Sequence, residues 1–113
     1  MEQRDYLLRM IEQFGQAVAR ILGFSSQSKF DDARRELDAA YESLGLARHM
    51  AARLDDASLR MLLREEKLRG LALLWAAETR LLRAEGRHDE ASSLEARVGQ
   101  LGFDAQALLE GSH

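Results

Sequence analysis

The chain has 113 residues and contains neither proline nor cysteine. Proline is the commonest helix breaker, so its absence leaves long helices uninterrupted. Without cysteine the chain can form no disulfide, no thiolate metal site and no cysteine nucleophile. A chain without cysteine also fits the reducing cytosol. At this length we expect one domain, spanning residues 1–110.

Long apolar runs and a charge excess of one sign are also missing. No segment approaches the roughly 18 apolar residues of a membrane span, and the first ten residues, MEQRDYLLRM, carry charges where a signal peptide has an apolar run. The 16 basic and 19 acidic residues are interspersed and give a net charge of -3, without the basic stripe that is typical of nucleic-acid binding. We therefore expect a cytoplasmic protein that binds neither membranes nor nucleic acid.

The sequence has helical periodicity from Asp5 onward. Apolar residues recur at alternating spacings of four and three up to Gly23, which predicts an amphipathic helix; they are Leu7, Ile11, Phe14, Val18 and Ile21. A serine-rich turn follows, with Ser28 as the expected N-cap of a second helix that stops at Gly45. Residues 5–44 are therefore predicted to form an antiparallel helical hairpin. Gly15 lies within the first helix, either to permit close helix approach or as a tolerated weak point.

A second hairpin is predicted over residues 68–101, with a turn at Gly86. The stretch between the two hairpins, residues 46–66, reads as an irregular helical middle, in which Asp55 or Asp56 suits a helix N-cap. Asp104 is the expected cap of a short C-terminal turn over residues 104–109. No stretch shows the period-two alternation of a strand. The predicted fold class is all-α, with antiparallel helical hairpins and about five helices.

The two hairpins carry a similar turn sequence. Phe30-Asp31-Asp32-Ala33 in the first corresponds to His88-Asp89-Glu90-Ala91 in the second. This pattern resembles the tetratricopeptide repeat, in which Ala91 takes the small position of the second helix and Trp75 the aromatic position of the first. The chain departs from that repeat at Thr79 and Leu82, and it lacks the closing proline. The resemblance implies a tetratricopeptide-like (TPR-like) fold.

The N-terminal string Asp5-Tyr6-Leu7-Leu8-Arg9-Met10-Ile11-Glu12-Gln13-Phe14 and the later Ala40-Tyr41-Glu42-Ser43-Leu44 give a second resemblance. Together they look like a family of small bacterial all-helical proteins of uncharacterised function. The resemblance is sharpest over the first quarter of the chain. It implies a bacterial origin and a helical fold, and it brings no catalytic residues.

Sites for chemistry are not evident in the sequence. Glu85 and His88 have the Glu-x-x-His spacing of helical di-iron sites once, but a turn at Gly86 separates them. The acidic pairs lack the Glu-x-x-Glu spacing of helical pyrophosphatases, and the glycines form no phosphate-binding loop. We therefore predict no enzyme activity, no catalytic residues, no cofactor and no metal.

Apolar surface beyond the needs of one hairpin indicates a protein-interaction role. We predict a module that binds other proteins, as a homodimer through the first helix, with an unknown partner, or both. The predicted interaction residues are Leu7, Met10, Ile11, Phe14, Val18, Ile21 and Trp75. Trp75 is open to two interpretations, as core packing or as a groove residue.

An alternative function remains open from the residues alone. Arg80, Arg83 and Arg87 could form a positive face near Trp75 that holds an anion between the two hairpins. Under that alternative the chain is a small-ligand-binding protein, with or without enzymatic activity. Partnered, solvated arginines are the competing interpretation.

Overall fold

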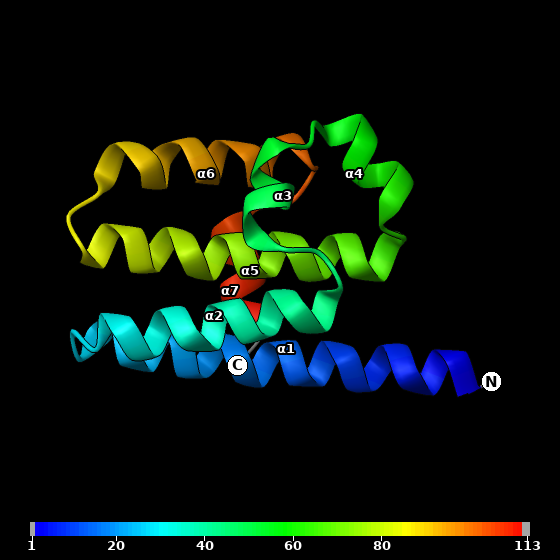
Figure 1. Cartoon of the computed structure of the whole chain (residues 1–113), viewed down its shortest axis with the longest axis horizontal. Coiled ribbons are helices and arrows are strands. Elements are labelled where there is room, and N and C mark those ends of the chain that lie inside the picture. Colours follow the sequence, from blue (N-terminus) through cyan, green and yellow to red (C-terminus); the bar gives the residue numbers. More distant parts are fainter. Residues whose placement is uncertain (1, 112–113) are drawn as a thin grey trace.

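The computed structural model describes the backbone of residues 2–111 and the side chains of residue 6 and residues 8–111; this part is all-helical and has no strand (Figure 1). Its seven helices are α1 (Glu2–Ser26), α2 (Phe30–Leu44), α3 (Arg48–Arg53), α4 (Asp56–Leu62), α5 (Glu65–Ala84), α6 (His88–Gln100) and α7 (Ala105–Gly111). The all-α class is confirmed. The predicted number of about five is lower than the seven found, because the middle of the chain and its C-terminal turn form three short helices.

The turn between α1 and α2 lies later than predicted. The Ser25 hydroxyl donates to the Ile21 carbonyl at 2.7 Å, and the Ser26 hydroxyl donates to the Gly23 carbonyl at 2.9 Å. Both serines therefore bond back onto α1 and belong to the helix rather than to a turn. Ser28 is not an N-cap, because it takes a left-handed φ of 60° inside the tight turn that precedes α2.

The end of α2 agrees with the prediction. Gly45 has a φ of 85°, and its N–H bonds to the carbonyls of Tyr41 and Glu42. A left-handed residue is strained with any side chain, so glycine is the residue that closes a helix in this way. The chain then turns away from α2 toward α3.

The middle of the chain, where the sequence leaves one helix or two open, forms two short helices. Leu54 is extended between α3 and α4, and the Asp55 carboxylate accepts the Ser58 N–H at 2.8 Å as the N-cap of α4. A second break follows at Leu63, which is also extended. Glu65 and Glu66 then lie in the first turn of α5, where the positive end of the helix dipole stabilises their negative charges.

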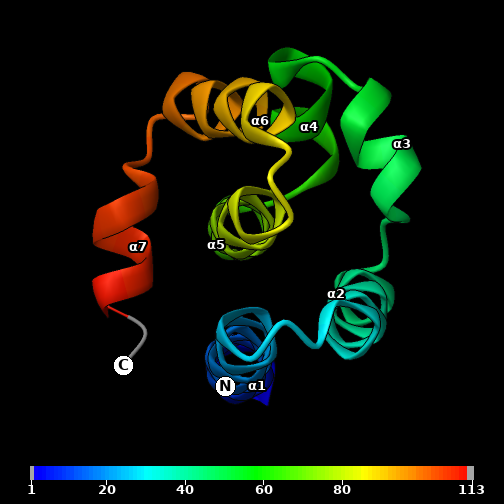
Figure 2. The ribbon, with the colours of Figure 1, turned by 90° about the vertical axis from the view of Figure 1, so that its left-hand side faces the viewer.

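Helix α5 is the centre of the molecule (Figure 2). It packs against α1, α2, α4, α6 and α7, and its side chains are buried on all sides over most of its length. A helix that is apolar all round is expected in the middle of a fold. Although α5 has 20 residues, no helix within residues 2–111 is both long and apolar enough to cross a membrane.

The four long helices form two antiparallel pairs, α1 with α2 and α5 with α6. Helix α2 runs back along α1, and α6 runs back along α5, while α1 and α5 point the same way (Figure 1). Gly70 sets the closeness of α1 and α5, because a Cβ there would lie 2.7 Å from the Phe14 ring. Close approach therefore depends on Gly70, which the sequence analysis did not single out.

The C-terminal helix α7 packs against α5 and less extensively against α6. Asp104 caps it, since its carboxylate accepts the N–H groups of Gln106 at 3.0 Å and Ala107 at 3.3 Å. The predicted cap is thus confirmed. Helix α7 buries Leu108 and Leu109 and covers a side of α5 that the other helices leave open (Figure 2).

Candidate functional site

The predicted interaction residues are mostly in the core. Five of the seven are at most 4% exposed: Met10, Phe14, Val18, Ile21 and Trp75. These side chains pack inside the single chain, so they leave no surface for a second protein, which corrects their assignment to an interface. Ile11 is partly buried, and the side chain of Leu7 lies outside the described residues. The apolar seam of α1 is filled by α2 and α5 together, which leaves no surplus on that face.

A groove lies on the next face of α1, between α1, α5 and α7. It has a volume of about 510 Å³ and is lined by Ile11, Glu12, Gly15, Gln16, Ala19, Arg69, Leu73, Leu108 and Gly111. Among the residues whose side chains are described, Ile11 is the one predicted interaction residue that lines the groove. This groove is the candidate functional site of the chain.

Small side chains on α1 create the hollow. Gly15 and Ala19 lie one helical turn apart and face the same side, so the α1 backbone forms a low wall there. Leu73 from α5 and Leu108 from α7 form an apolar floor and are 8% and 6% exposed. A groove with an apolar floor and an accessible backbone wall accepts a helix or an extended apolar segment.

The rim of the groove is polar. Glu12 and Gln16 extend from α1, and Arg69 extends from α5 on the other side. All three side chains are exposed. A rim with both charge signs around an apolar floor is the arrangement of protein-binding surfaces, where burial supplies affinity and the rim sets specificity.

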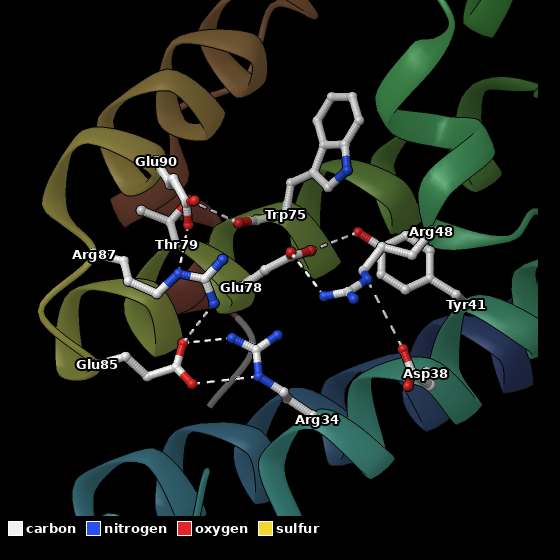
Figure 3. A network of polar contacts seen from close by, with 10 residues as sticks. All are labelled: Arg34, Asp38, Tyr41, Arg48, Trp75, Glu78, Thr79, Glu85, Arg87 and Glu90. Atoms are coloured by element: carbon white, nitrogen blue, oxygen red, sulfur yellow. Dashed lines mark hydrogen bonds and ion pairs between the residues drawn. The ribbon is translucent and has the colours of Figure 1, made fainter. Parts of the chain in front are cut away.

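The opposite side of α5 carries a polar network instead (Figure 3). Glu78 is the only acidic residue between Glu66 and Glu85, and it points toward α2 and α3. The Tyr41 hydroxyl donates to its carboxylate at 3.0 Å, and the Arg48 guanidinium donates at 3.3 Å. Glu78 thereby links three helices.

Burial shifts the pKa of both acids in this network. Loss of solvation raises the pKa of Glu78, against the opposing effect of the Arg48 charge. Burial also raises the pKa of Tyr41 well above its ordinary value, and the negative charge of Glu78 adds to that rise. A buried acid with a raised pKa can mark a functional site, and it can equally mark a structural link. Here both Glu78 oxygens already have partners within the chain.

Arginine–carboxylate pairs continue the network along α5. Glu85 accepts from Arg34 on α2 through both of its oxygens, and Arg87 reaches Glu85 at 3.3 Å (Figure 3). Arg87 also pairs with Glu90 in the first turn of α6. A two-point arginine–carboxylate contact fixes orientation as well as distance. The pairs therefore hold α2 and the α5–α6 turn in one arrangement.

Arg97 of α6 fastens the α3–α4 segment. Its guanidinium lies 4.6 Å from the ring centroid of Trp75 and donates to the carbonyls at the end of α3: Ala51 at 3.4 Å, Ala52 at 3.0 Å and Leu54 at 2.6 Å. The acceptors are carbonyls that a helix end leaves without intrahelical partners. Arg97 thus works as a C-terminal cap supplied from another helix.

Of the three arginines predicted to hold an anion, two are already paired with glutamates and the third is exposed. Arg83 pairs with Glu95 at 2.6 Å, Arg87 pairs with two glutamates, and Arg80 is exposed. A pocket of about 440 Å³ does lie between α3, α5 and α6, beside Glu78 and Arg97. Among the side chains that the structure describes, those of residue 6 and residues 8–111, no group of three His, Cys, Asp or Glu is placed to hold a metal ion.

Sequence reasoning missed most of the groove and the network. The spacing of Gly15 and Ala19 on a face beside the core stripe was a usable signal for the groove. The single acid within the apolar run of α5 was a usable signal for Glu78. Arg97 gave none, because its partners are backbone carbonyls about 45 residues earlier in the chain.

Comparison with known proteins adds no relative. No protein-family model, curated protein or solved structure matches this chain.

Proposed function

We propose that this chain is a non-catalytic protein-interaction module that binds its partner in the groove between α1, α5 and α7. The observation that carries the proposal is the groove itself, with its apolar floor of Leu73 and Leu108 and its charged rim. The partner is a protein, and a second copy of the chain is the first candidate. The cysteine-free composition supports a cytoplasmic setting.

The arrangement of the helices supports a TPR-like interpretation of the fold. Helices α1 and α2 form one antiparallel pair and α5 and α6 a second, while the short α7 runs crosswise beside α5 (Figure 2). The groove is lined by α1 and α5, which are the first helices of the two pairs, and by α7. Stacked helical pairs bind partners on such concave surfaces. The inserted α3 and α4 distinguish this chain from a regular array, and the resemblance to small bacterial helical proteins stays a prediction.

A variant that fills the groove tests the function. Ala19 is exposed on the groove wall, so Ala19→Arg adds bulk and charge there without entering the core. Ala96→Arg on the exposed side of α6 is the matched control. Immobilised wild-type chain is expected to retain a defined protein, either a second copy of the chain or another protein. The amount of this protein retained by immobilised Ala19→Arg should be at least tenfold lower. Equal retention by both variants, with both folded by circular dichroism, would remove the groove as the binding site.

A second candidate function rests on the pocket between α3, α5 and α6. The observation in its favour is the buried Glu78 carboxylate beside a volume of about 440 Å³. Arg87 and Arg97 line that pocket with their guanidinium groups already bonded within the chain. Asp89 also lines the pocket and joins no ion pair among the described residues, so a cationic small ligand is favoured over an anion. Thermal-shift screening with matched amines and carboxylates tests this, and no shift with either class would reject it.

A further inference from the structure

The segment between the two helical pairs, residues 47–62, is attached to the fold differently from the long helices, and we call it the strap. It contains α3 and α4 and is bounded by extended backbone at Ala47 and at Leu63. Its two ends lie at the same end of the molecule, where α2 stops and α5 begins (Figure 1). Because α2 packs directly against α5, the two pairs stay joined when the strap moves.

The strap buries little apolar surface. Ala51 and Leu59 are the buried side chains of its two helices, whereas α5 is buried over most of its length. Three large apolar side chains of the strap face solvent instead: Met50 is 45% exposed, Met61 89% and Leu62 62%. A segment with few buried apolar contacts opens at a lower free energy than the core does.

Arginines hold the strap closed. Arg97 of α6 donates to the three carbonyls at the end of α3. Arg48 of α3 donates to Glu78 on α5 at 3.3 Å, and Arg60 of α4 donates to the Leu101 carbonyl at 3.0 Å. Water can replace such bonds when the strap moves away, so their loss costs less than exposure of the apolar core.

The strap covers the side of α5 that carries Trp75. The indole is 1% exposed, lies 4.6 Å from the Arg97 guanidinium and stands beside the ribbon of α3 (Figure 3). The pocket of about 440 Å³ between α3, α5 and α6 reaches the strap at Ala52. Opening of the strap therefore joins this pocket to the Trp75 face and lengthens it along α5.

We propose that the strap opens as a unit about Ala47 and Leu63 and uncovers Trp75, while α1, α2, α5, α6 and α7 stay folded. The closed strap restricts access to that face of α5. The inference goes beyond the proposed function, because it concerns the side of α5 opposite the groove.

Limited digestion with trypsin tests the opening. Arg53 and Arg60 lie on the strap, Arg69 and Arg80 lie on α5, and all four are exposed. Helices of six and seven residues do not persist once detached, so opening makes the strap sites cleavable, whereas only global unfolding makes the α5 sites cleavable. Relative to the urea-unfolded chain, cleavage should be about tenfold faster or more at the strap sites, because it follows the population of the open form.

Hydrogen exchange at Trp75, the only tryptophan of the chain, gives an internal comparison. Strap opening exposes the indole N–H and leaves the backbone N–H bonded within α5, whereas global unfolding exposes both. Relative to the unfolded chain, the indole should therefore exchange faster than the backbone. Arg48→Ala removes the contact to Glu78 and leaves Arg97 over Trp75, so it should raise indole exchange about tenfold. Arg83→Ala is the control, because it breaks an ion pair between α5 and α6 and leaves the strap contacts intact.

Faster cleavage of the strap, faster indole exchange and a further rise in Arg48→Ala together support the proposal. Equal corrected rates at the strap and α5 sites, or an indole N–H that exchanges only with the backbone N–H, would show that the strap opens only by global unfolding and would overturn it. An equal rise in Arg83→Ala would overturn it as well. The groove variant Ala19→Arg tests the proposed function separately, so failure of one proposal is distinguishable from failure of the other.

Discussion

The two sides of α5 are buried in different ways. Toward α1 and α7, its neighbours are apolar side chains, and closeness is set by shape at the contact of Gly70 with Phe14. Toward α2, α3 and α6, its neighbours are bonded through Glu78, Glu85 and the arginines that reach them. The apolar side leaves the groove of about 510 Å³, while the polar side leaves the pocket of about 440 Å³, whose arginines are bonded within the chain. Apolar surface that the chain does not bury against its own helices is available for contact with a partner.

The largest effect is expected on the polar side, at Arg97. Arg97→Ala removes the donor to three carbonyls at the end of α3 and uncovers Trp75. Because charged hydrogen bonds are lost and acceptors are left unpaired, the free energy of unfolding should fall by about 2–3 kcal/mol. Urea denaturation followed by circular dichroism measures this. Arg80→Ala is the control, since Arg80 is exposed and joins no ion pair among the described residues, and a loss no larger than its own would contradict the role of Arg97.

A smaller effect is expected on the apolar side, at Gly70. Gly70→Ala gains about 1 kcal/mol in helix propensity but sets a methyl group 2.7 Å from the buried Phe14 ring. Overpacking costs about 1–3 kcal/mol, so a net loss of about 1 kcal/mol is expected. Gly99→Ala has nothing within 4 Å of the new methyl group and should instead gain about 0.5–1 kcal/mol. Thermal melts of the two variants should shift in opposite directions, and two shifts of the same sign would contradict the close contact.

The smallest effect is expected for Glu78→Gln, and it depends on pH. Because burial raises the pKa of Glu78 in the folded chain, the folded state binds its proton more tightly than the unfolded state does. This stabilisation is complete below the unfolded pKa and is lost as pH rises through the folded pKa. Glu78→Gln cannot titrate, so the melting temperature of the wild-type chain relative to this variant should fall as pH rises from acid to neutral.

The comparison with Glu78→Ala separates charge from hydrogen bonding. The amide of Gln can still accept from the Tyr41 hydroxyl, whereas Ala leaves that buried hydroxyl without its acceptor, at about 1–3 kcal/mol. Both variants should lose the same pH dependence. A melting temperature of the wild-type chain that stays constant or rises relative to that of Glu78→Gln as pH increases would contradict the raised pKa.

Local signals in the sequence predicted the four long helices and several helix ends correctly. The acidic caps at Asp55 and Asp104 and the glycine stop at Gly45 depend only on neighbouring backbone groups. Ser25, Ser26 and Ser28 were misassigned because a serine hydroxyl can cap the next helix or bond back to the previous one. Serine contributes little to the apolar periodicity of a helix. The local sequence pattern therefore does not distinguish a serine that caps the next helix from one that bonds back to the previous helix.

The sequence alone determined the all-α class, the apolar seam of α1 and the two long antiparallel pairs, because the spacing of apolar residues is a property of each helix by itself. Tertiary structure decided what each apolar face meets. Packing of α1 against α2 and α5 buries four of the predicted interaction residues, Met10, Phe14, Val18 and Ile21, and the groove at Gly15 and Ala19 lies between α1, α5 and α7. Arg97 reaches carbonyls far away in sequence for the same reason. Which face remains exposed depends on the helices that cover it, and that follows from the arrangement of the whole chain.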